Sequence, residues 1–563
     1  MKGRHPMNYD NNENNSDIQE TSMMQDAKEF FLHCEYEEAF TLLEKLSKTQ
    51  CANAFYLLAK LYNGHFIPSC NDKVLQKKYY RRGHELGSKL CSLWYCIMER
   101  PNYGQPKLIE EIKNEALEGD VFAQYELSFL YYSGLMVVVD AGESVRWCEM
   151  AAKQGYALAQ YDMASFYTNG WGVKKDSHKA FSWYEKAAEN GHAAAQCKLG
   201  DMYFEGDDNI AQDHVKAVAW YTKAAEKNNP LAQCNLGFMY DNGYGIEQDR
   251  KKALNCYKQS AQCGHAPAQC NLGVMYASGC IVGEDPKEAV KWYTLAAKQN
   301  FAPAQFYLGK MYDTGSGIEQ DYKKAIKWYR QAAQQNHAAA QCVLATMYDE
   351  GVGTDQDFQQ AASLYAASAA QGYAPAQFEL AAMYKSGEGV PRDDSKAYQW
   401  FLKAAEQDDP YSAYHLGVMC QKGEGTIKDY QEAKKWYQKA AAKGMGQADY
   451  QIACMYLDGE GVTKDYEKAS YYFKEAAQKG DPKGQCSIGV MYENGYGVEK
   501  NYIEAQKWYQ QAAEEGEVTA QYNLGALYAS GKIGENKKNA CLWMKKAAEN
   551  GDKSALKWLE HDK

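Results

Sequence analysis

Short glycine-containing segments are the first places in this 563-residue chain where chemistry could be expected. In Gly243–Gly245 two glycines flank a tyrosine, but no Gly-Lys-Ser/Thr follows and no strand-like run precedes, as a phosphate-binding loop would need. In Asp313–Gly317 an aspartate stands beside two glycines, without the alternating oxygen ligands and terminal Glu of a calcium-binding loop. We interpret both segments as connections between helices.

Histidine and cysteine are the other residue types that could bind a metal or react with a substrate. The 11 histidines and 17 cysteines show neither His-x3-His nor Cys-x-x-Cys spacing, so no zinc site is predicted. Cys263 and Cys270 are close in sequence, but Cys270 belongs to a repeating pattern of the chain. No Ser, Cys or Lys nucleophile is distinct from that pattern. We therefore expect no catalytic residue, no metal and no cofactor, and we predict that the protein is not an enzyme.

Charge and hydropathy exclude further classes of protein. The formal net charge is −11 and both signs are interspersed, which argues against the basic surface that binds nucleic acid. No segment has the apolar core of a signal peptide or the length of a transmembrane helix, because the apolar run at 135–139 is far too short. We expect a cytoplasmic protein with free thiols, and export by an unrecognised route is left open.

A 36-residue repeat organises most of the chain. Its marker is a glutamine that follows alanine, or once glycine, at positions 124, 160, 196, 233, 269, 305, 341, 377, 485 and 521. One step is 37 residues, and Ala413 and Asp449 occupy the two vacant positions. Leu, Met or Ile follows three residues later, Tyr after seven in all but one repeat, and Gly after ten. These spacings predict one face of a helix, here called helix A, which the glycine ends.

A second helix, called helix B, is predicted to begin after an aspartate such as Asp321, whose side chain can cap the first turn. Helix B carries Lys-Ala, a Trp-Tyr pair such as Trp328 and Tyr329, and Ala-Ala. We expect both aromatic residues in the core, where their polar atoms need partners that the repeat glutamine could supply. One helix pair cannot bury its own apolar face, so the pairs are predicted to stack into an all-α solenoid.

The expected organisation follows from this phase. Residues 1–24 are predicted to be a disordered polar tail, 25–119 degenerate helical repeats, and 552–563 a capping helix. The twelve regular repeats are 120–155, 156–191, 192–228, 229–264, 265–300, 301–336, 337–372, 373–408, 409–444, 445–480, 481–516 and 517–551.

The consensus Ala-x-Ala-Gln-x-x-Leu-Gly-x-Met-Tyr-x-x-Gly-x-Gly-Val-x-x-Asp-x-x-Lys-Ala-x-x-Trp-Tyr-x-Lys-Ala-Ala resembles the Sel-1-like repeat family, which is related to the tetratricopeptide repeat. The resemblance covers about residues 120–551 and is specific because the pattern recurs twelve times. It implies a right-handed α/α superhelix. It also implies a scaffold or adaptor function in protein complexes, in signalling, in membrane-protein quality control and in bacterial interaction with host cells.

The resemblance leaves two alternatives to a scaffold. One branch of the family is cysteine-rich, disulfide-bonded and associated with β-lactam binding and hydrolysis, and it pairs a helix B cysteine with one in the neighbouring helix A. Here the helix B position is alanine in nearly every repeat, and the helix A cysteines have no periodic partner; they are Cys197, Cys234, Cys270, Cys342 and Cys486. This departure argues against that activity. The other alternative is a regulatory activator subunit of a membrane enzyme.

Two positions of helix A, two and five residues after the glutamine, have residue types that packing does not dictate. Each position forms a row when it is followed from repeat to repeat. The rows vary between repeats and are separated by one helical turn, so they are predicted to line the concave groove of the superhelix. The partner-binding residues predicted here are Lys198, Asn235, Phe238, Asn271, Tyr307 and Lys310. The two lysines favour an acidic or carboxylate-ended segment of a protein or peptide partner. The alternative is a variable solvated face. We expect a monomer that binds no nucleic acid and does not insert into membranes.

Overall fold

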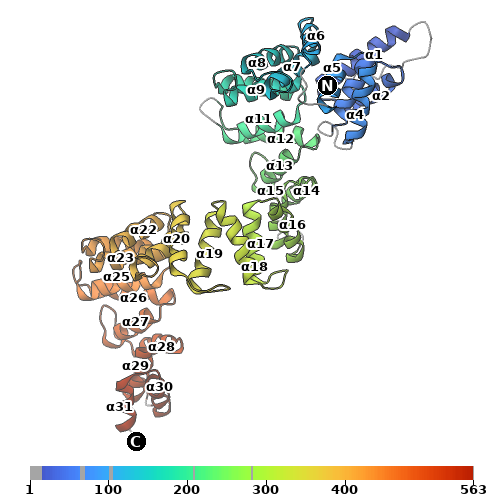
Figure 1. Ribbon diagram of the computed structural model, residues 1–563. Coiled ribbons are helices and arrows are strands. Elements are labelled where there is room, and N and C mark those ends of the chain that lie inside the picture. Colours follow the sequence, from blue (N-terminus) through green and yellow to red (C-terminus); the bar gives the residue numbers. More distant parts are fainter. Residues whose placement is uncertain are drawn as a thin grey trace. The chain divides into compact units, whose positions relative to one another are not determined.

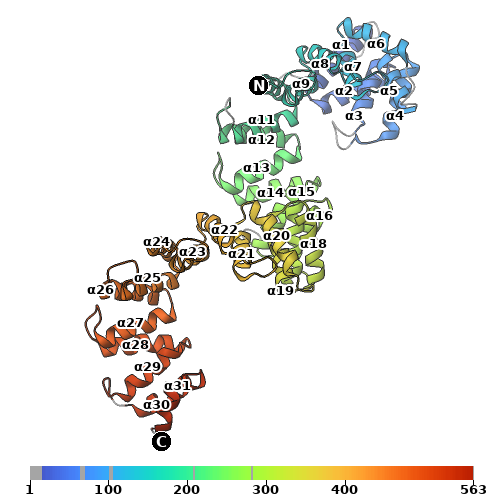
Figure 2. The same cartoon turned by 60° about the vertical axis from the view of Figure 1, so that its left-hand side comes forward.

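The computed structural model describes residues 16–63, 70–99, 105–206, 210–279, 283–534 and 536–561. These residues form 31 helices and no strand, which confirms the all-α prediction (Figure 1). Within each of its two compact units, each helix packs beside the next along the chain (Figure 2). No helix among the described residues is long and apolar enough to cross a membrane.

The chain divides into two compact units between Asp285 and Pro286, and the division falls inside the fifth repeat, between its helix A and helix B. The helices of unit 1 are α1 (Ser16–Leu32), α2 (Tyr36–Lys48), α3 (Ala52–Leu61), α4 (Lys73–Glu85), α5 (Lys89–Glu99), α6 (Pro106–Leu117), α7 (Val121–Ser133), α8 (Ala141–Lys153), α9 (Ala157–Asn169), α10 (Ser177–Glu189), α11 (Ala193–Glu205), α12 (His214–Glu226), α13 (Pro230–Asn242), α14 (Arg250–Gln262) and α15 (Ala266–Ser278).

The helices of unit 2 continue the same alternation of helix A and helix B. They are α16 (Pro286–Lys298), α17 (Ala302–Thr314), α18 (Tyr322–Gln334), α19 (Ala338–Glu350), α20 (Phe358–Ala370), α21 (Ala374–Ser386), α22 (Asp394–Glu406), α23 (Pro410–Lys422), α24 (Tyr430–Ala442), α25 (Gly446–Asp458), α26 (Tyr466–Gln478), α27 (Pro482–Asn494), α28 (Tyr502–Glu514), α29 (Val518–Ala529), α30 (Lys537–Glu549) and α31 (Lys553–His561).

The ends of the helices follow from local residue types. After α17, Gly315 adopts a left-handed conformation with φ of 72°, which is strained for other residues. Before α18, the Asp321 carboxylate accepts a hydrogen bond from the backbone N–H of Lys324 at 3.0 Å and so caps the first turn. The pattern that predicted these boundaries is therefore explained by backbone geometry.

The repeat glutamine links neighbouring helices and does not contact the Trp-Tyr pair, so the suggestion that it supplies their polar partner is wrong. The Gln341 amide donates to the Ala333 carbonyl at the end of the preceding helix B, at 3.1 Å. Its oxygen accepts from Gln371, at the end of the helix B that follows, at 2.7 Å. In one repeat the direction is reversed, because the Gln485 amide donates to Glu515 at 3.2 Å and the Gln485 oxygen is buried without a hydrogen-bond partner among the described residues. Contacts equivalent to that of Gln341 join Gln124 to Gln154, Gln160 to Asn190, Gln305 to Gln335, Gln377 to Gln407 and Gln521 to Asn550. We call this series the glutamine ladder.

The Trp-Tyr pair is divided between core and surface, unlike the prediction that both residues are buried. Tyr329 is only 1% exposed, whereas Trp328 is half-buried. Adjacent residues of a helix are 100° apart, and in this pair it is the tyrosine that faces the core. Several of the tryptophans carry a lysine over the ring, as Lys403 does at 3.9 Å above Trp400.

The two ends of the chain differ from the regular repeats. Helix α1 begins at Ser16, so residues 16–24 are helical and the prediction that the disordered tail extends to residue 24 is wrong. Residues 1–15 lie outside the described residues. Helix α31 falls in the segment expected to cap the array: Ala555 is buried, and Trp558 and Leu559 pack against the buried cluster of α30.

Candidate partner-binding face

The two variable rows lie on adjacent helices A, and side-chain contacts join one repeat to the next. In unit 1 the rows, here called the helix A face, consist of Glu126, Phe129, Asp162, Ser165, Lys198, Asp201, Asn235, Phe238, Asn271 and Val274. The Tyr125 hydroxyl of α7 donates to Asp162 of α9 at 2.8 Å. The Asn235 amide of α13 donates to Asp201 of α11 at 3.1 Å. Side chains of successive helices A are therefore neighbours along this face.

The predicted site residues are divided between the two units. Lys198, Asn235, Phe238 and Asn271 belong to α11, α13 and α15 of unit 1. Tyr307 and Lys310 belong to α17 of unit 2. Within unit 2 the Tyr307 ring stacks on the Tyr293 ring at 5.2 Å between centroids, and Lys310 is exposed.

Asp201 is the centre of a polar cluster on the helix A face of unit 1. Its carboxylate accepts hydrogen bonds from Tyr221 at 2.9 Å and from Asn235 at 3.1 Å. The Lys198 ammonium lies 3.7 Å away, one turn earlier on the same helix. Burial raises the pKa of the Asp201 carboxyl, while the hydrogen bond from Tyr221 and the charge of Lys198 act in the opposite direction.

This cluster changes the interpretation of two predicted residues. The charge of Lys198 is offset by Asp201, so Lys198 no longer favours an acidic ligand. The Asn235 amide already has an intramolecular acceptor, and Asn271 opposes the rise that burial causes in the pKa of Tyr257. Asn235 therefore belongs to the internal contacts of this face. The spacing of Lys198 and Asp201, three residues apart, was visible in the sequence and is the pattern that could have indicated the pairing of Lys198.

An aromatic cluster lies beside Asp201 in the same unit. It comprises Phe204 at the end of α11, His214 at the start of α12, Phe238 on α13, and Tyr244 in the following loop. The Phe204 ring centroid is 5.2 Å from that of His214 and 6.0 Å from those of Phe238 and Tyr244. Phe238 and Tyr244 are each 40% exposed. The sequence rows contain only Phe238, because the other three residues are at helix ends and in a loop.

The charges around this cluster are predominantly acidic. Glu205 follows Phe204, is exposed, and has no ion-pair partner among the described residues. Asp241 lies one turn after Phe238 and pairs with Arg250 at 3.6 Å. With Asp201, three carboxyl groups stand on α11 and α13, two of the elements that carry the cluster, against the two cations Lys198 and Arg250.

Asp162 is an unusual carboxyl group on this face. Burial raises its pKa to about 6, and the hydrogen bond from Tyr125 only partly offsets that rise. The charge at this position is therefore sensitive to pH just below neutrality.

The first position of the face, Glu126, is covered by the protein's own N-terminal helices, whereas Phe129 remains 36% exposed. Glu126 is 1% exposed and accepts hydrogen bonds from the Tyr56 hydroxyl at 2.5 Å and the Trp94 indole N–H at 3.0 Å. Lys60 forms an ion pair with the same carboxylate, and its ammonium lies 4.2 Å from the centroid of the Trp94 ring. The Trp94 ring in turn lies 5.7 Å from that of Phe129. Helices α3 and α5 thus occupy this end of the face.

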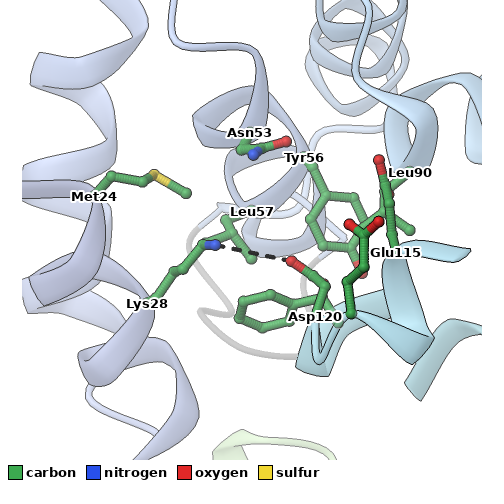
Figure 3. A pocket seen from close by; sticks show the side chains of 10 residues that line it. Met24, Lys28, Asn53, Tyr56, Leu57, Leu90, Glu115 and Asp120 are labelled. Atoms are coloured by element: carbon green, nitrogen blue, oxygen red, sulfur yellow. Dashed lines mark ion pairs between the residues drawn. The ribbon is translucent and has the colours of Figure 1, made fainter. Parts of the chain in front are cut away.

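A pocket of about 330 Å³ lies next to these contacts, between α1, α3 and the start of α7 (Figure 3). Lys28 reaches across its opening toward Asp120, with 3.9 Å between the charged atoms. Met24, Asn53 and Glu115 also contribute to the lining. The mixture of apolar, amide and charged groups does not assemble a nucleophile with a base.

The helix A face of unit 2 has different side chains. From the eighth repeat onward, the row five residues after the glutamine position is small and apolar, and it consists of Ala382, Val418, Cys454, Val490 and Ala526. All five are half-buried. Aromatic side chains also gather on this unit: Phe378 and Phe401 lie against His415, which belongs to the row two residues after the glutamine position. Tyr411, beside Phe378, is 61% exposed.

The described part of the chain holds sixteen cysteines but no metal-binding cluster. There, no group of three or more His, Cys, Asp or Glu side chains is placed to hold a metal ion. The sixteen cysteines within these residues are all free thiols, and burial raises the pKa of several of them, including Cys197 and Cys234 to about 12. A raised thiol pKa lowers the fraction of reactive thiolate at neutral pH.

Comparison with known proteins identifies the family. The sequence model of the Sel1 repeat matches twelve consecutive segments, at 121–156, 157–192, 193–229, 230–265, 266–301, 302–337, 338–373, 374–409, 410–445, 446–481, 482–517 and 518–552. These segments make up most of the chain, so the protein belongs to the Sel1 repeat family. The resemblance drawn from the consensus is confirmed.

Solved structures agree with this assignment. A protective antigen from uropathogenic Escherichia coli strains, which displays an SLR fold, is 30% identical over 81% of this chain and 97% of its own, with a TM-score of 0.63. A Sel1 repeat protein from Oxalobacter formigenes is 31% identical over 58% of this chain and 93% of its own, with a TM-score of 0.44. No curated protein sequence matches the chain.

Proposed function

We propose that the protein is a non-enzymatic scaffold that binds a segment of a partner protein along its helix A face. Sel1 repeat solenoids are in general protein-interaction scaffolds, and this chain has the repeat throughout residues 121–552. The finer proposal is that the two variable rows form the concave binding surface. The partner is a protein or peptide bound by a single copy of the chain.

The observation that carries the proposal is the exposed aromatic cluster of Phe204, His214, Phe238 and Tyr244. The second to eleventh repeats all bury a core tyrosine or phenylalanine on helix B, yet Phe238 and Tyr244 keep 40% of their surface in solvent. Exposed aromatic groups that touch one another form an apolar patch, and such patches are typical of interaction sites. Burying one aromatic side chain in an interface contributes on the order of 1.5–3 kcal/mol.

The predicted residues divide according to this proposal. Phe238 would contact the partner directly because its ring is exposed. Asn235 and Lys198 would orient Asp201, since both already contact its carboxylate. Asn271 would extend the face by one repeat, and Tyr307 and Lys310 would belong to the corresponding face of unit 2.

Selection from a random 12-residue peptide display library tests the proposal without a known partner. The full-length protein is the bait, and each selected peptide is measured again on Phe238→Glu and on Tyr471→Glu. Tyr471 is the matched control because it is an exposed aromatic residue on a helix B, with 57% of its surface in solvent. We expect Phe238→Glu to abolish binding of most selected peptides and Tyr471→Glu to preserve it. The proposal is wrong if the selected peptides bind both variants like the wild type.

A further inference from the structure

We infer that the helix A face of unit 1 recognises a partner segment in which a lysine or arginine stands next to an aromatic side chain. This inference rests on the proposed function and specifies the chemistry of the partner. It differs from the acidic ligand predicted from the sequence, because that prediction counted Lys198 as an unpaired charge and combined it with Lys310 of the other unit.

The first argument comes from the end of the face where the Glu126 carboxylate is buried by the protein's own helices and Phe129 stays partly exposed. There, the acidic residue and the phenylalanine of the first repeat, Glu126 and Phe129, are contacted by Lys60 and Trp94. The lysine ammonium lies over the tryptophan ring, so the two groups act as one cationic and aromatic unit. The protein's own helices therefore demonstrate which chemistry this type of surface accepts.

The second argument is that the open part of the face also offers a carboxylate and a phenylalanine, here on two adjacent helices instead of one. Asp201 supplies the carboxylate, and Phe238 supplies a phenylalanine from the row that also contains Phe129. Their helices are adjacent, since the Asn235 amide of α13 reaches Asp201 of α11. Phe204 and Tyr244 enlarge the aromatic surface beyond what the first repeat has.

The third argument is charge complementarity. Both nearby cations are already paired, Lys198 with Asp201 and Arg250 with Asp241. Glu205 has no ion-pair partner among the described residues, and it lies one turn after Asp201 on the same helix. A partner cation would enter a region with more carboxylates than ammonium groups, and complementary charge increases both association rate and specificity.

Three synthetic fluorescent 12-residue peptides test the inference by fluorescence anisotropy with the full-length protein. The first contains Lys-Trp pairs separated by Gly-Ser spacers, the second has Glu in place of Lys, and the third has Ala in place of Trp. We expect the Lys-Trp probe to bind at least tenfold more tightly than either of the others. Raising the salt concentration should weaken that binding, because exposed charges are screened.

Two variants separate the contributions of charge and aromatic surface. The double variant Asp201→Asn with Glu205→Gln should lower the affinity for the Lys-Trp probe about tenfold. The amide introduced at position 201 still has an oxygen that can accept hydrogen bonds from Tyr221 and Asn235. Phe238→Ala should lower the affinity for both probes that contain Trp. Tyr471→Ala, on a helix B of unit 2, should change none of the affinities. Far-ultraviolet circular dichroism and thermal unfolding establish that each variant is folded.

Each other result overturns a defined part of the reasoning. Equal affinity for the Lys-Trp and Glu-Trp probes, with both lost in Phe238→Ala, rejects the cationic partner and leaves the proposed face intact. Affinities that do not respond to Phe238→Ala reject the face itself, and with it the proposed function. Absence of binding by all three probes up to millimolar concentration rejects the inference, while the library selection still tests the proposed function independently.

Discussion

Repeats 301–408 of unit 2 and repeats 192–264 of unit 1 have the same core but different polar contacts. In the first region Gln305, Gln341 and Gln377 each contact the carbonyl of the preceding helix B and the glutamine that ends the following one. In the second region the oxygens of Gln196 and Gln233 are buried without a hydrogen-bond partner among the described residues.

The cause is a change of residue type at the end of helix B. Lys227 occupies this position in repeat 192–228, and Cys263 in repeat 229–264, where the repeats of 301–408 have glutamine. Lys227 directs its ammonium to the Gly191 carbonyl instead, and the Cys263 thiol is exposed. The glutamine ladder is therefore interrupted in two successive repeats.

The interruption coincides with the aromatic cluster and Asp201, which belong to the same two repeats. In a solenoid, stability is approximately the sum of repeat stabilities and contacts between neighbours, so losing a polar contact weakens one interface without unfolding the array. The two regions share their apolar core, whereas the polar links and the exposed groups distinguish the region with the candidate site.

The largest expected effect tests the shared core. Tyr221→Ala in the interrupted region and Tyr329→Ala in the regular region each remove a tyrosine that is buried in the structure. Each should lower the free energy of unfolding by about 3–5 kcal/mol, measured by urea denaturation followed by circular dichroism. Trp328→Ala is the matched control and should cost less than Tyr329→Ala, because Trp328 is half-buried. A loss below about 1 kcal/mol for either tyrosine would mean that the two regions do not share a core.

The next effect tests the glutamine ladder. Gln371→Ala removes the donor to Gln341 and leaves the Gln341 oxygen buried without that partner. The expected cost is about 1–3 kcal/mol in the free energy of unfolding, since an unpaired buried acceptor loses its hydration. Cys263→Ala at the equivalent position of unit 1 should change stability by less than about 0.5 kcal/mol, because Cys263 is exposed. Equal effects of the two substitutions would contradict the difference between the regions.

A third effect concerns Asp162, whose pKa burial raises to about 6. The unfolded chain should titrate near pH 3.9, so between about pH 4 and pH 6 the folded state holds a proton that the unfolded state has lost. The contribution of the Asp162 carboxyl to the free energy of unfolding is therefore fully present at low pH and is lost as the pH rises through 6. Asp162→Asn should be more stable than wild type by about 1–2 kcal/mol at pH 7.5, and the difference should vanish below pH 4.

The matched control for this titration is Asp213, a helix cap whose pKa is lowered, chiefly by the hydrogen bond from the backbone N–H of Lys216. Asp213→Asn should show the opposite sign, because a lowered pKa favours the folded state above the unfolded value and loses that contribution in acid. Urea denaturation of both variants from acid to mildly alkaline pH provides the measurement. A pH-independent difference between wild type and Asp162→Asn would show that Asp162 has an ordinary pKa.

The smallest effect restores a missing contact. Cys263→Gln places an amide where Gln335 and Gln371 stand in the regular repeats, within reach of the unpaired Gln233 oxygen. The gain in the free energy of unfolding should be about 0.5–1.5 kcal/mol, and hydrogen exchange should slow in repeat 229–264. Cys263→Ser is the control because its side chain is too short to span that distance. No gain for the glutamine would mean that the ladder does not explain the difference between the regions.

The helices and their ends could be predicted from the sequence because short-range rules determine them. Gly315 adopts the left-handed conformation that its position predicted, and Asp321 caps α18 as expected. The errors concern contacts between residues that are 30 or more positions apart. The contact of Gln341 with Gln371 and that of Asn235 with Asp201 both depend on how one helix pair packs on the next.

The candidate site was only partly predictable for the same reason. Phe238 was found because it occupies a variable row, but Phe204, His214 and Tyr244 join it only through the packing of α11, α12 and the loop after α13. The covering of Glu126 by Lys60 and Trp94 also joins segments distant in the sequence.

The sequence by itself determined the helical repeat, its phase, its caps and its family, because these depend on residues within a few turns of one another and recur twelve times. The tertiary structure alone decided that the tyrosine and not the tryptophan faces the core, and that the glutamine links repeats. It also decided that Lys198 and Arg250, the cations near Phe238, are paired with carboxylates. These outcomes depend on the rotation of each helix against its neighbours, which sets the side chains that meet, and periodicity does not specify that rotation.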